Sequence, residues 1–272
     1  MPIILISRGT MAGGQEVAQC LQERSGIRCL TREDLISAVN AHGEAAAKVV
    51  NALPKAVRAY REFSSLRRPY KILMRLALLE FFSEGQCAYL GYSGHLLLPN
   101  FPQYLRVRLL APERYRLQRT MERLRLTEND ARDYVQRADD ERLTWCRFMY
   151  GKDLRDPLQY DICLNMAKAG VGGVCSMLLC AAEKEAFQAT PESEEEARNL
   201  LLATRVLAEL VVDEEAGSLE LGATAKDGAI LIEGPYLDEA ERDGILGKAA
   251  KVGGVTSADY RPGYGPTGDF GA

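Results

Sequence analysis

The first forty residues alternate between short apolar runs and amphipathic stretches. Residues 3–6, Ile-Ile-Leu-Ile, form a continuous apolar run, which predicts a buried strand. A turn with Gly9, Gly13 and Gly14 follows, and the apolar positions of residues 16–21 then share one helical face. This order predicts a phosphate-binding loop, because glycines let the backbone approach an anion closely and a helix N-terminus offers free N–H groups.

The same alternation continues to about residue 187. Apolar runs predict further strands at residues 27–30, 86–92, 104–111 and 161–166. Helical patterns are expected at residues 32–40, from about 44 to 84 with interruptions at Pro54 and Pro69, after Pro112, and from Thr127 to about Tyr150. Residues 181–187 are expected to be part of a last helix. Strands separated by helices predict an α/β fold with a mostly parallel sheet flanked by helices. Ligands of such sheets bind at the carboxyl ends of the strands.

The last eighty residues follow a different pattern. Residues 188–197 are acidic and are expected to be a linker between a first domain, residues 1–187, and a second, residues 198–261. The second domain is predicted to be a small α+β unit with the order helix, strand, strand, helix, strand. Its elements are an amphipathic helix, strands at residues 218–224 and 229–233 around the hairpin dipeptide Asp227-Gly228, a helix at 237–251 and a strand at 255–260. The Gly/Pro-rich residues 262–272 are expected to be a disordered tail.

Charge separates the two halves as well. Residues 1–189 contain 27 Lys/Arg and 21 Asp/Glu, whereas residues 190–272 contain 7 and 17, giving balances of +6 and −10. This difference favours two domains with different partners, of which the basic one would attract anions such as nucleotides. The alternative is that the surface charge serves solubility only.

Cysteine usage and hydropathy favour a cytoplasmic protein. The seven cysteines are scattered and include no C-x-x-C, which indicates reduced thiols. The two histidines make a Cys/His zinc site improbable. We find neither an apolar run of transmembrane length nor the pattern of a signal peptide, and we expect no membrane insertion and no nucleic-acid partner.

The glycine turn has the spacing of a nucleotide-binding loop. Gly9 and Gly14 stand as in G-x-x-x-x-G-K-[ST], but Gln15 occupies the lysine position and Glu16 the hydroxyl position. A Gly-rich turn of another α/β fold is the alternative. The candidate residues for binding ATP are Gly9, Thr10, Met11, Ala12, Gly13, Gly14, Gln15 and Glu16.

Three segments of residues 1–187 together carry a resemblance to a known family. ISRGTMAGGQEVA is similar to the opening of cytidylate-kinase-like proteins, a branch of the P-loop nucleoside monophosphate kinases whose loop often reads S-R-x-x-G-S-G-G-R-E-I-A without a lysine. LGYSGHLLLP resembles that family's G-R-x-x-x-x-L-L turn, and RADDERLTWCRFMYGKDLRDPLQYDICLNM resembles its lid helix and closing strand. The resemblance implies transfer of the γ-phosphoryl group of ATP to a nucleoside monophosphate such as CMP or dCMP, with Mg²⁺.

The resemblance also implies roles for individual residues. The lid would supply the catalytic arginines, with an aspartate three residues before one of them to orient it, and a carboxylate in the loop could bind Mg²⁺. The lid candidates are Arg137, Arg142, Arg147 and Asp139, the metal candidate is Glu16, and the substrate-binding candidates are Thr31, Arg67, Arg68, Tyr92 and His95. The arginines could equally form a solvated helix face, and His95 could be a buried structural histidine.

Two departures from the family pattern keep a second hypothesis open. Gln15 lacks the charge of a loop lysine or arginine, and Tyr92 replaces the arginine of the G-R turn. Losing a cation that stabilises the transition state of phosphoryl transfer can cost several orders of magnitude in rate. The alternative to a kinase is therefore a weak or inactive nucleotide-binding regulatory protein. The complete lid segment favours the kinase.

Residues 198–261 resemble a BON domain, in LVVDEEAGSLELGATAKDGAILIEGPY and AAKVGGVTSADY. BON domains are regarded as modules that bind membranes or proteins. The acidic balance of this region disfavours docking on an anionic bilayer. We expect a sensory, ligand-binding or oligomerising role, with a second copy of the chain or another protein as the partner.

Overall fold

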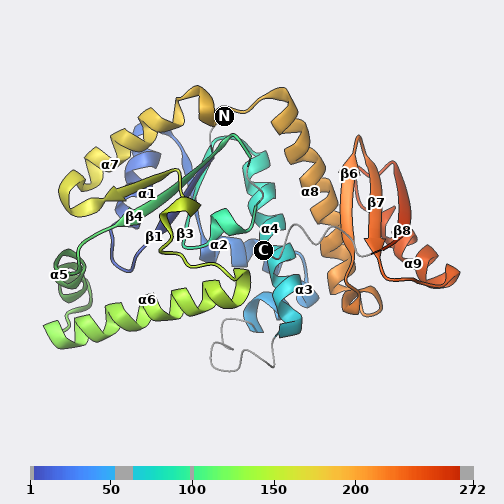
Figure 1. Ribbon diagram of the computed structural model, residues 1–272, viewed down its shortest axis with the longest axis horizontal. Helices are drawn as coiled ribbons and strands as arrows, with labels where there is room; N and C mark the ends of the chain where they lie inside the picture. Colours follow the sequence, from blue (N-terminus) through green and yellow to red (C-terminus); the bar gives the residue numbers. More distant parts are fainter. Residues whose placement is uncertain (1–2, 53–63, 99–100, 264–272) are drawn as a thin grey trace. The chain divides into compact units, whose positions relative to one another are not determined.

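The computed structural model describes residues 3–52, 64–98 and 101–263 (Figure 1). The chain forms two compact units, and each is composed of two segments. Unit 1 comprises Met1–Asp34 and Gly85–Thr190, and unit 2 comprises Leu35–Glu84 and Pro191–Ala272. This division differs from the predicted domains 1–187 and 198–261, because the helical residues 35–84 group with the C-terminal part of the chain.

Unit 1 contains a five-stranded parallel sheet with the order β2-β3-β1-β4-β5. The strands are β1 (Ile3–Arg8), β2 (Arg28–Thr31), β3 (Cys87–Gly91), β4 (Tyr104–Leu110) and β5 (Ile162–Asn165). The helices α1 (Gly14–Ser25), α5 (Glu113–Leu124), α6 (Glu128–Tyr150) and α7 (Met166–Ala182) complete the unit. The predicted α/β class is confirmed, with a parallel sheet of the P-loop kinase type. The central strand β1 pairs Ser7 with Gly91 and with Arg108, so its carboxyl end lies beside those of β3 and β4.

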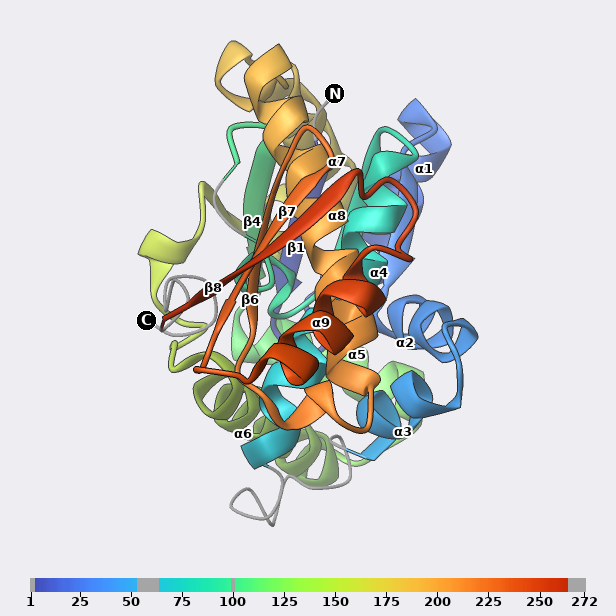
Figure 2. The same cartoon turned by 90° about the vertical axis from the view of Figure 1, so that its right-hand side faces the viewer.

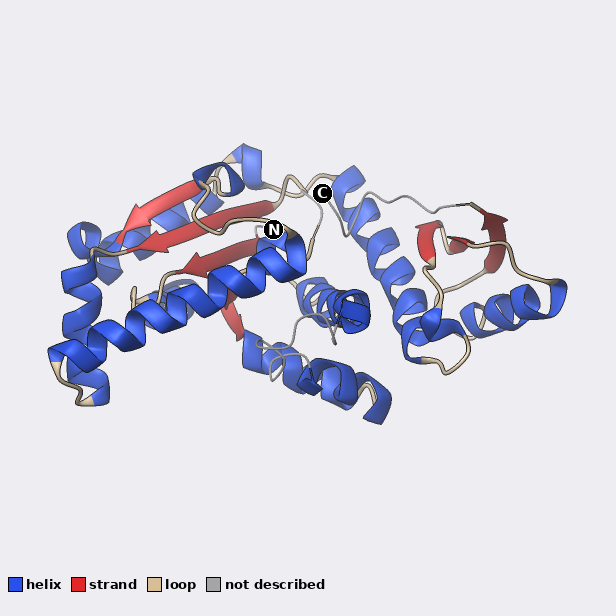
Figure 3. Cartoon of the chain, turned by 60° about the horizontal axis from the view of Figure 1, so that its bottom comes forward, coloured by secondary structure: helices blue, strands red, loops and turns tan. Residues whose placement is uncertain are grey.

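Unit 2 contains the helices α2 (Arg32–Ala41), α3 (Glu44–Ala52), α4 (Arg67–Ser83), α8 (Pro191–Val212) and α9 (Glu239–Ala249), with α2 beginning at the end of unit 1. Its sheet has the order β6-β7-β8, and Figures 2 and 3 show the three strands side by side. These strands are β6 (Gly222–Lys226), β7 (Ala229–Gly234) and β8 (Ser257–Pro262). The predicted order helix, strand, strand, helix, strand is confirmed. The hairpin between β6 and β7 turns at Asp227 and Gly228, whose φ angles of 51° and 85° suit the predicted Asp-Gly turn.

Two predicted boundaries at the C-terminal side were wrong. The acidic residues from Pro191 are helical rather than a linker, and proline is well tolerated where it stands, at the first position of α8. The predicted tail begins inside β8, since Pro262 pairs with Gly234. The rest of that tail, residues 264–272, lies outside the described residues.

Helix α7 was largely missed by the sequence pattern, which identified only residues 181–187 as part of a last helix. It begins at Met166, where the Asn165 side chain accepts a hydrogen bond of 3.0 Å from the Ala167 N–H. Gly170 interrupts it with a φ of 64°, and glycines at this point weaken the helical pattern.

The predicted break at Pro69 was also wrong. Pro69 lies in the first turn of α4, where its missing N–H has no helical acceptor to lose. Pro54 lies outside the described residues.

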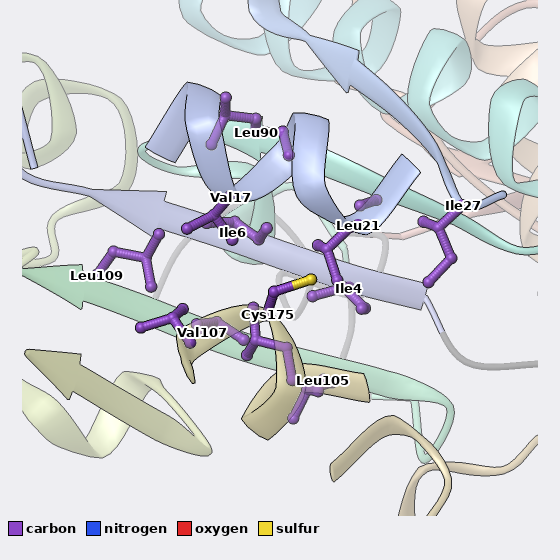
Figure 4. Close-up of a cluster of buried hydrophobic side chains, with 14 of the residues drawn as sticks. Ile4, Ile6, Val17, Leu21, Ile27, Leu90, Leu105, Val107, Leu109 and Cys175 are labelled. Carbon is purple, nitrogen blue, oxygen red and sulfur yellow. The ribbon is translucent and has the colours of Figure 1, made fainter. Parts of the chain in front are cut away.

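A buried apolar cluster fixes the position of the first helix against the unit 1 sheet (Figure 4). Val17 and Leu21 of α1 and Cys175 of α7 pack on alternate residues of β1 and β4, including Ile6 and Val107. Because these strand residues alternate along the chain, they project from one face, and α1 and α7 cover that face together. The N-terminus of α1 is thereby held at the carboxyl edge of β1.

No single helix among the described residues is long and apolar enough to cross a membrane, although the bent pair Met166–Ala182 and Glu185–Val212 meets that test by length and composition.

Candidate functional site

The glycine loop connects the carboxyl end of β1 to the first turn of α1. Gly13 stands at the N-cap position of α1 with a φ of 86°, a conformation that glycine adopts without strain. The Gly9 N–H donates to the Leu109 carbonyl at 3.2 Å, and the Ala12 N–H donates to the Gly9 carbonyl at 3.2 Å, which fixes the loop on β4 and on itself. The N–H groups of the first turn of α1 have no acceptor within the helix and are available to an anion.

A side chain at position 14 would collide with its surroundings. A Cβ built on Gly14 would lie 3.0 Å from Arg8 Nε and 3.0 Å from Leu90 Cδ1. A larger residue at position 14 would therefore have to displace the side chains of Arg8 and Leu90. The Arg8 side chain passes directly over the start of α1.

Asp139 of α6 ties the loop down. Its Oδ1 accepts hydrogen bonds from the Thr10 N–H at 3.0 Å and from the Thr10 hydroxyl at 2.6 Å, and its Oδ2 pairs with Arg116 of α5. Burial alone would raise the pKa of the Asp139 carboxyl, but the hydrogen bonds from Thr10 and Arg116 hold it below the ordinary value. Arg142 Nη1 lies 4.0 Å from Asp139 Oδ1 and donates to Thr10 Oγ1 at 2.8 Å. Asp139 thus binds the loop itself, in addition to the predicted contact with Arg142.

Tyr92 places the guanidinium of Arg142. The Arg142 Cζ lies 5.7 Å from the centroid of the Tyr92 ring, within the range of a cation–π interaction. The Tyr92 carbonyl accepts a hydrogen bond of 2.9 Å from Ser7 Oγ, and Arg108 donates to the same Ser7 oxygen at 2.7 Å. Burial lowers the pKa of the Arg142 guanidinium, and the carboxylate of Asp139 opposes this change. The tyrosine that replaces the expected arginine therefore packs against an arginine from another helix.

A groove of about 430 Å³ runs beside the loop, between α1 and α5. It is lined by Gln15, Glu16, Gln19, Arg119, Glu122 and Arg123. Glu16 forms an ion pair with Arg119, whose guanidinium lies 5.5 Å from the Tyr115 ring centroid. The groove thus combines polar groups with two arginines directly next to the first turn of α1.

The donor set near the loop fits a metal that arrives bound to phosphates better than a metal held by the protein alone. Among the residues that the structure describes, no group of three or more His, Cys, Asp or Glu side chains could hold a metal ion. Mg²⁺ in kinases is commonly bound by substrate phosphates, waters and one or two carboxylates. Glu16 is close enough to the loop for that role, although Arg119 pairs with it.

The other two lid candidates, Arg137 and Arg147, do not bind the glycine loop. Arg137 is exposed, and it forms no hydrogen bond or ion pair with any residue in the described ranges. Arg147 pairs with Asp153 at 2.7 Å, and Asp153 also binds Arg155 at 2.6 Å. The structure therefore brings together Asp139 and Arg142 of the lid segment, but not Arg137 or Arg147.

Two substrate-binding candidates in unit 1 have local structural partners. The Thr31 hydroxyl donates to Asp34 Oδ2 at 2.7 Å and accepts from the Asp34 N–H at 3.3 Å, which caps α2. His95 is 8% exposed, and its ring centroid lies 4.8 Å from that of Tyr160. Burial lowers the pKa of His95 to about 4, so the ring is neutral at pH 7. This environment favours the structural alternative for His95.

Arg67 and Arg68 belong to unit 2, at the start of α4. Arg68 donates to the Leu219 carbonyl at 3.4 Å and to the Leu221 carbonyl, both in the segment that leads into β6. Burial lowers the pKa of Arg68, and the carboxylate of Glu220 opposes this change. Arg68 is thus engaged in holding the small sheet to α4.

Sequence reasoning missed four arginines near the loop. Arg8 and Arg108 lie at the carboxyl ends of β1 and β4, and that position in a parallel sheet was a usable signal. Arg116 and Arg119 lie on α5, and only the structure shows that this helix faces the loop.

Unit 2 has a cavity of its own, of about 420 Å³, lined by residues of α4, α8 and α9. Its charged groups largely pair with one another. Glu80 binds His42 at 3.1 Å and Arg205 at 3.4 Å, and Asp213 binds Lys248 at 2.7 Å. These pairs involve most, but not all, of the charged side chains that line the cavity, since Glu209 and Lys251 line it as well.

Comparison with solved structures finds several chains with a similar fold. The crystal structure of an uncharacterized protein from Eubacterium ventriosum is 20% identical, covers 68% of this chain and 100% of that chain, and has a TM-score of 0.51. TT1252 from Thermus thermophilus is 17% identical, with 67% and 97% covered and a TM-score of 0.46. Shikimate kinase from Acinetobacter baumannii, in complex with shikimate, is 14% identical, with 66% and 92% covered and a TM-score of 0.38.

At these identities the likeness shows the fold alone, and only the first score is high enough to argue from. A comparison with curated proteins found no match. The model of the Cytidylate kinase-like family matches residues 3–168, which include the glycine loop, the Tyr92 turn, Asp139 and Arg142. The chain therefore belongs to the cytidylate kinase-like family.

Proposed function

We propose that unit 1 transfers the γ-phosphoryl group of ATP to a nucleoside monophosphate, with CMP or dCMP as the acceptor. The observation that carries the proposal is the junction of the glycine loop with α6, where Thr10, Asp139 and Arg142 meet. This junction places a guanidinium directly above a loop whose helix N-terminus suits phosphate. Membership of the cytidylate kinase-like family supports phosphoryl transfer as the reaction.

The donor nucleotide is proposed to bind along α1. Its phosphates would lie on the N–H groups at the start of the helix, and its nucleoside part would extend into the groove between α1 and α5. Arg119 and Arg123 line that groove and would contact the ribose or phosphates. Mg²⁺, bound to the ATP phosphates with Glu16 as the proposed protein ligand, would neutralise charge on them.

The acceptor is proposed to bind beyond the loop, at the carboxyl ends of β2 and β3. Thr31 ends β2, and the Arg32 guanidinium lies 5.8 Å from the Trp145 ring centroid. Tyr92 follows β3, and the Arg142 guanidinium packs against the Tyr92 ring. An acceptor phosphate between Arg32 and Arg142 would stand in line with the donor phosphates. Phosphoryl transfer depends mainly on such positioning and on positive charge at the equatorial oxygens.

A coupled ADP-release assay tests the proposal. Full-length protein, ATP and Mg²⁺ are incubated with each nucleoside monophosphate, and ADP formation is expected to be fastest with CMP or dCMP. The variant Arg142→Ala should lower kcat by about 100-fold or more. Arg132→Ala is the matched control, because Arg132 is on the same helix but pairs only with exposed surface carboxylates. Equal turnover in the Arg142→Ala variant would contradict the assigned site.

The second candidate is a nucleotide-binding protein without turnover. The neutral Gln15 in the loop and Tyr92 in place of an arginine favour it. It predicts heat of ATP binding in calorimetry and no ADP above background with any acceptor. Turnover with any nucleoside monophosphate would exclude it.

Residues 198–261 are proposed to act as a BON-like binding module that contacts a protein partner or a second copy of the chain. The observed order of α8, β6, β7, α9 and β8 supports this proposal. Light scattering after size-exclusion chromatography, over a range of protein concentrations, measures self-association directly. A monomer at all concentrations would leave a different protein as the proposed partner.

A further inference from the structure

The glycine loop lacks its own cation. Gln15 occupies the position at which P-loop enzymes carry a lysine, and an amide has no charge to offer a phosphate. The Gln15 side chain is exposed and lines the groove between α1 and α5. A kinase built on this loop therefore needs a cation from elsewhere to stabilise the transferring group.

Most arginines near the loop already have a polar partner. Arg116 pairs with Asp139, and Arg119 pairs with Glu16. Arg108 and Arg142 donate to the hydroxyl groups of Ser7 and Thr10, respectively.

Arg8 differs from these four. It makes no hydrogen bond or ion pair with any residue that the structure describes, although its side chain is only half-exposed. A half-buried guanidinium without an acceptor costs free energy until an anion reaches it.

The position of Arg8 matches the missing lysine. It is the last residue of β1, and its side chain passes over Gly14, the first residue of α1, with Nε 3.0 Å from the Cβ position built there. It therefore lies at the same helix N-terminus that Gln15 leaves without a charge. Burial lowers the pKa of Arg8, repulsion by the positive charge of Arg142 lowers it further, and the carboxylate of Glu33 opposes both changes. An anion bound by Arg8 and Arg142 would relieve the repulsion between these two guanidinium groups.

We propose that Arg8 is the catalytic cation of this site and takes the role of the loop lysine by holding the phosphoryl group during its transfer. The inference rests on the proposed kinase function. In the step, an oxygen of the acceptor phosphate forms a bond to the γ-phosphorus. The bond from that phosphorus to the β,γ-bridging oxygen breaks, and ADP leaves with the electron pair. Arg8 stays protonated and stabilises charge on the γ-phosphoryl oxygens together with Arg142.

A charge-relocation experiment tests Arg8. Arg8→Met retains an apolar stem over Gly14 without the charge, and Arg8→Lys retains the charge without the planar fork. Arg8→Met is expected to lower kcat about 100- to 1,000-fold, and Arg8→Lys less. Adding Gln15→Lys to Arg8→Met returns a cation to the loop. The double variant should have a kcat at least tenfold higher than that of Arg8→Met. Arg132→Met is the control, and thermal unfolding verifies that each variant is folded.

A second readout does not depend on turnover. A contact between Arg8 and the γ-phosphoryl group predicts that Arg8→Met weakens binding of ATP, measured by calorimetry with Mg²⁺, at least tenfold more than binding of ADP. Wild-type kcat in Arg8→Met, or equal weakening for ATP and ADP, would overturn the assignment of Arg8. Absence of turnover in the wild type would instead count against the proposed kinase, and the comparison of ATP with ADP would still decide whether Arg8 contacts the γ-phosphoryl group.

Discussion

The bond between Asp139 and the glycine loop can be tested by removing one charge. Asp139→Asn keeps the shape of the side chain and one acceptor oxygen, but it loses the ion pair with Arg116 and the charge assistance in the two bonds from Thr10. A hydrogen bond to a charged group contributes about 1.5–3 kcal/mol and a neutral one about 1 kcal/mol. The Asp139 side chain is 29% exposed, so solvent reduces the difference, and we expect a loss of about 1–2 kcal/mol.

The amide of Thr10 reports this loss locally. Its N–H donates to Asp139, and a loss of about 1–2 kcal/mol corresponds to exchange with solvent that is about 5- to 30-fold faster. Hydrogen exchange at pH 7, resolved to the peptide that contains residue 10, measures this change. Asp140→Asn is the control, because Asp140 is the neighbouring residue and is exposed. Unchanged exchange at Thr10 in Asp139→Asn would refute the inferred strength of the contact.

The effect also has a defined pH dependence. The pKa of the Asp139 carboxyl is lower in the folded protein than its ordinary value, so the folded state binds this proton less tightly than the unfolded state. The stabilisation is therefore complete above the unfolded-state pKa of about 3.9 and is lost as the pH falls through the folded-state pKa. The difference between wild type and Asp139→Asn in thermal midpoint should be full at pH 7 and should shrink below pH about 4. A difference that grows on acidification would contradict the assigned cause.

Three further substitutions test local contacts within unit 1 or within unit 2. Gly14→Ala places a methyl group against Arg8 and should lower stability by about 1–3 kcal/mol and weaken ATP binding, as measured by denaturant unfolding and calorimetry. Arg68→Ala removes the donor to two carbonyls before β6 and should lower the free energy of unfolding by about 1–2 kcal/mol, with unfolding of unit 2 followed by hydrogen exchange. Asp238→Ala removes the capping box that Asp238 and Glu241 form at α9 and should cost about 1 kcal/mol, whereas Glu239→Ala should cost little.

The sequence pattern predicts most of unit 1 because its strands are short apolar runs bounded by clear turns. Each of the five strands was found, and Thr127 was recognised as the start of α6, where its side chain accepts a hydrogen bond from Asp130 N. Helix α7 was missed in large part because Gly170 and its neighbouring glycines weaken the helical pattern. The association of residues 35–84 with residues 191–272 could not be predicted, since it depends on contacts between segments more than a hundred residues apart.

The site was predictable only where its residues are close in sequence. The glycine loop has a recognisable spacing, and Asp139 and Arg142 share one face of a helix. The contact between Asp139 and Thr10 joins residues 129 positions apart, and no periodicity reports it. Arg8 immediately precedes Gly9, the first residue of the motif, and its closeness to Gly14 follows only from the path of the chain in space.

Unit 2 is formed by two segments that are far apart in the sequence, and this has a consequence for the synthesis of the chain on the ribosome. A ribosome completes α2, α3 and α4 more than a hundred residues before α8, which packs against α4, leaves the exit tunnel. During that interval the apolar side chains of α4, which are buried in the finished protein, lack part of their cover. A chain that stops before α8 would keep this defect permanently. The C-terminal segment is thus needed to finish a unit that begins in the first third of the chain, and shortened chains are expected to collect in aggregates or on chaperones.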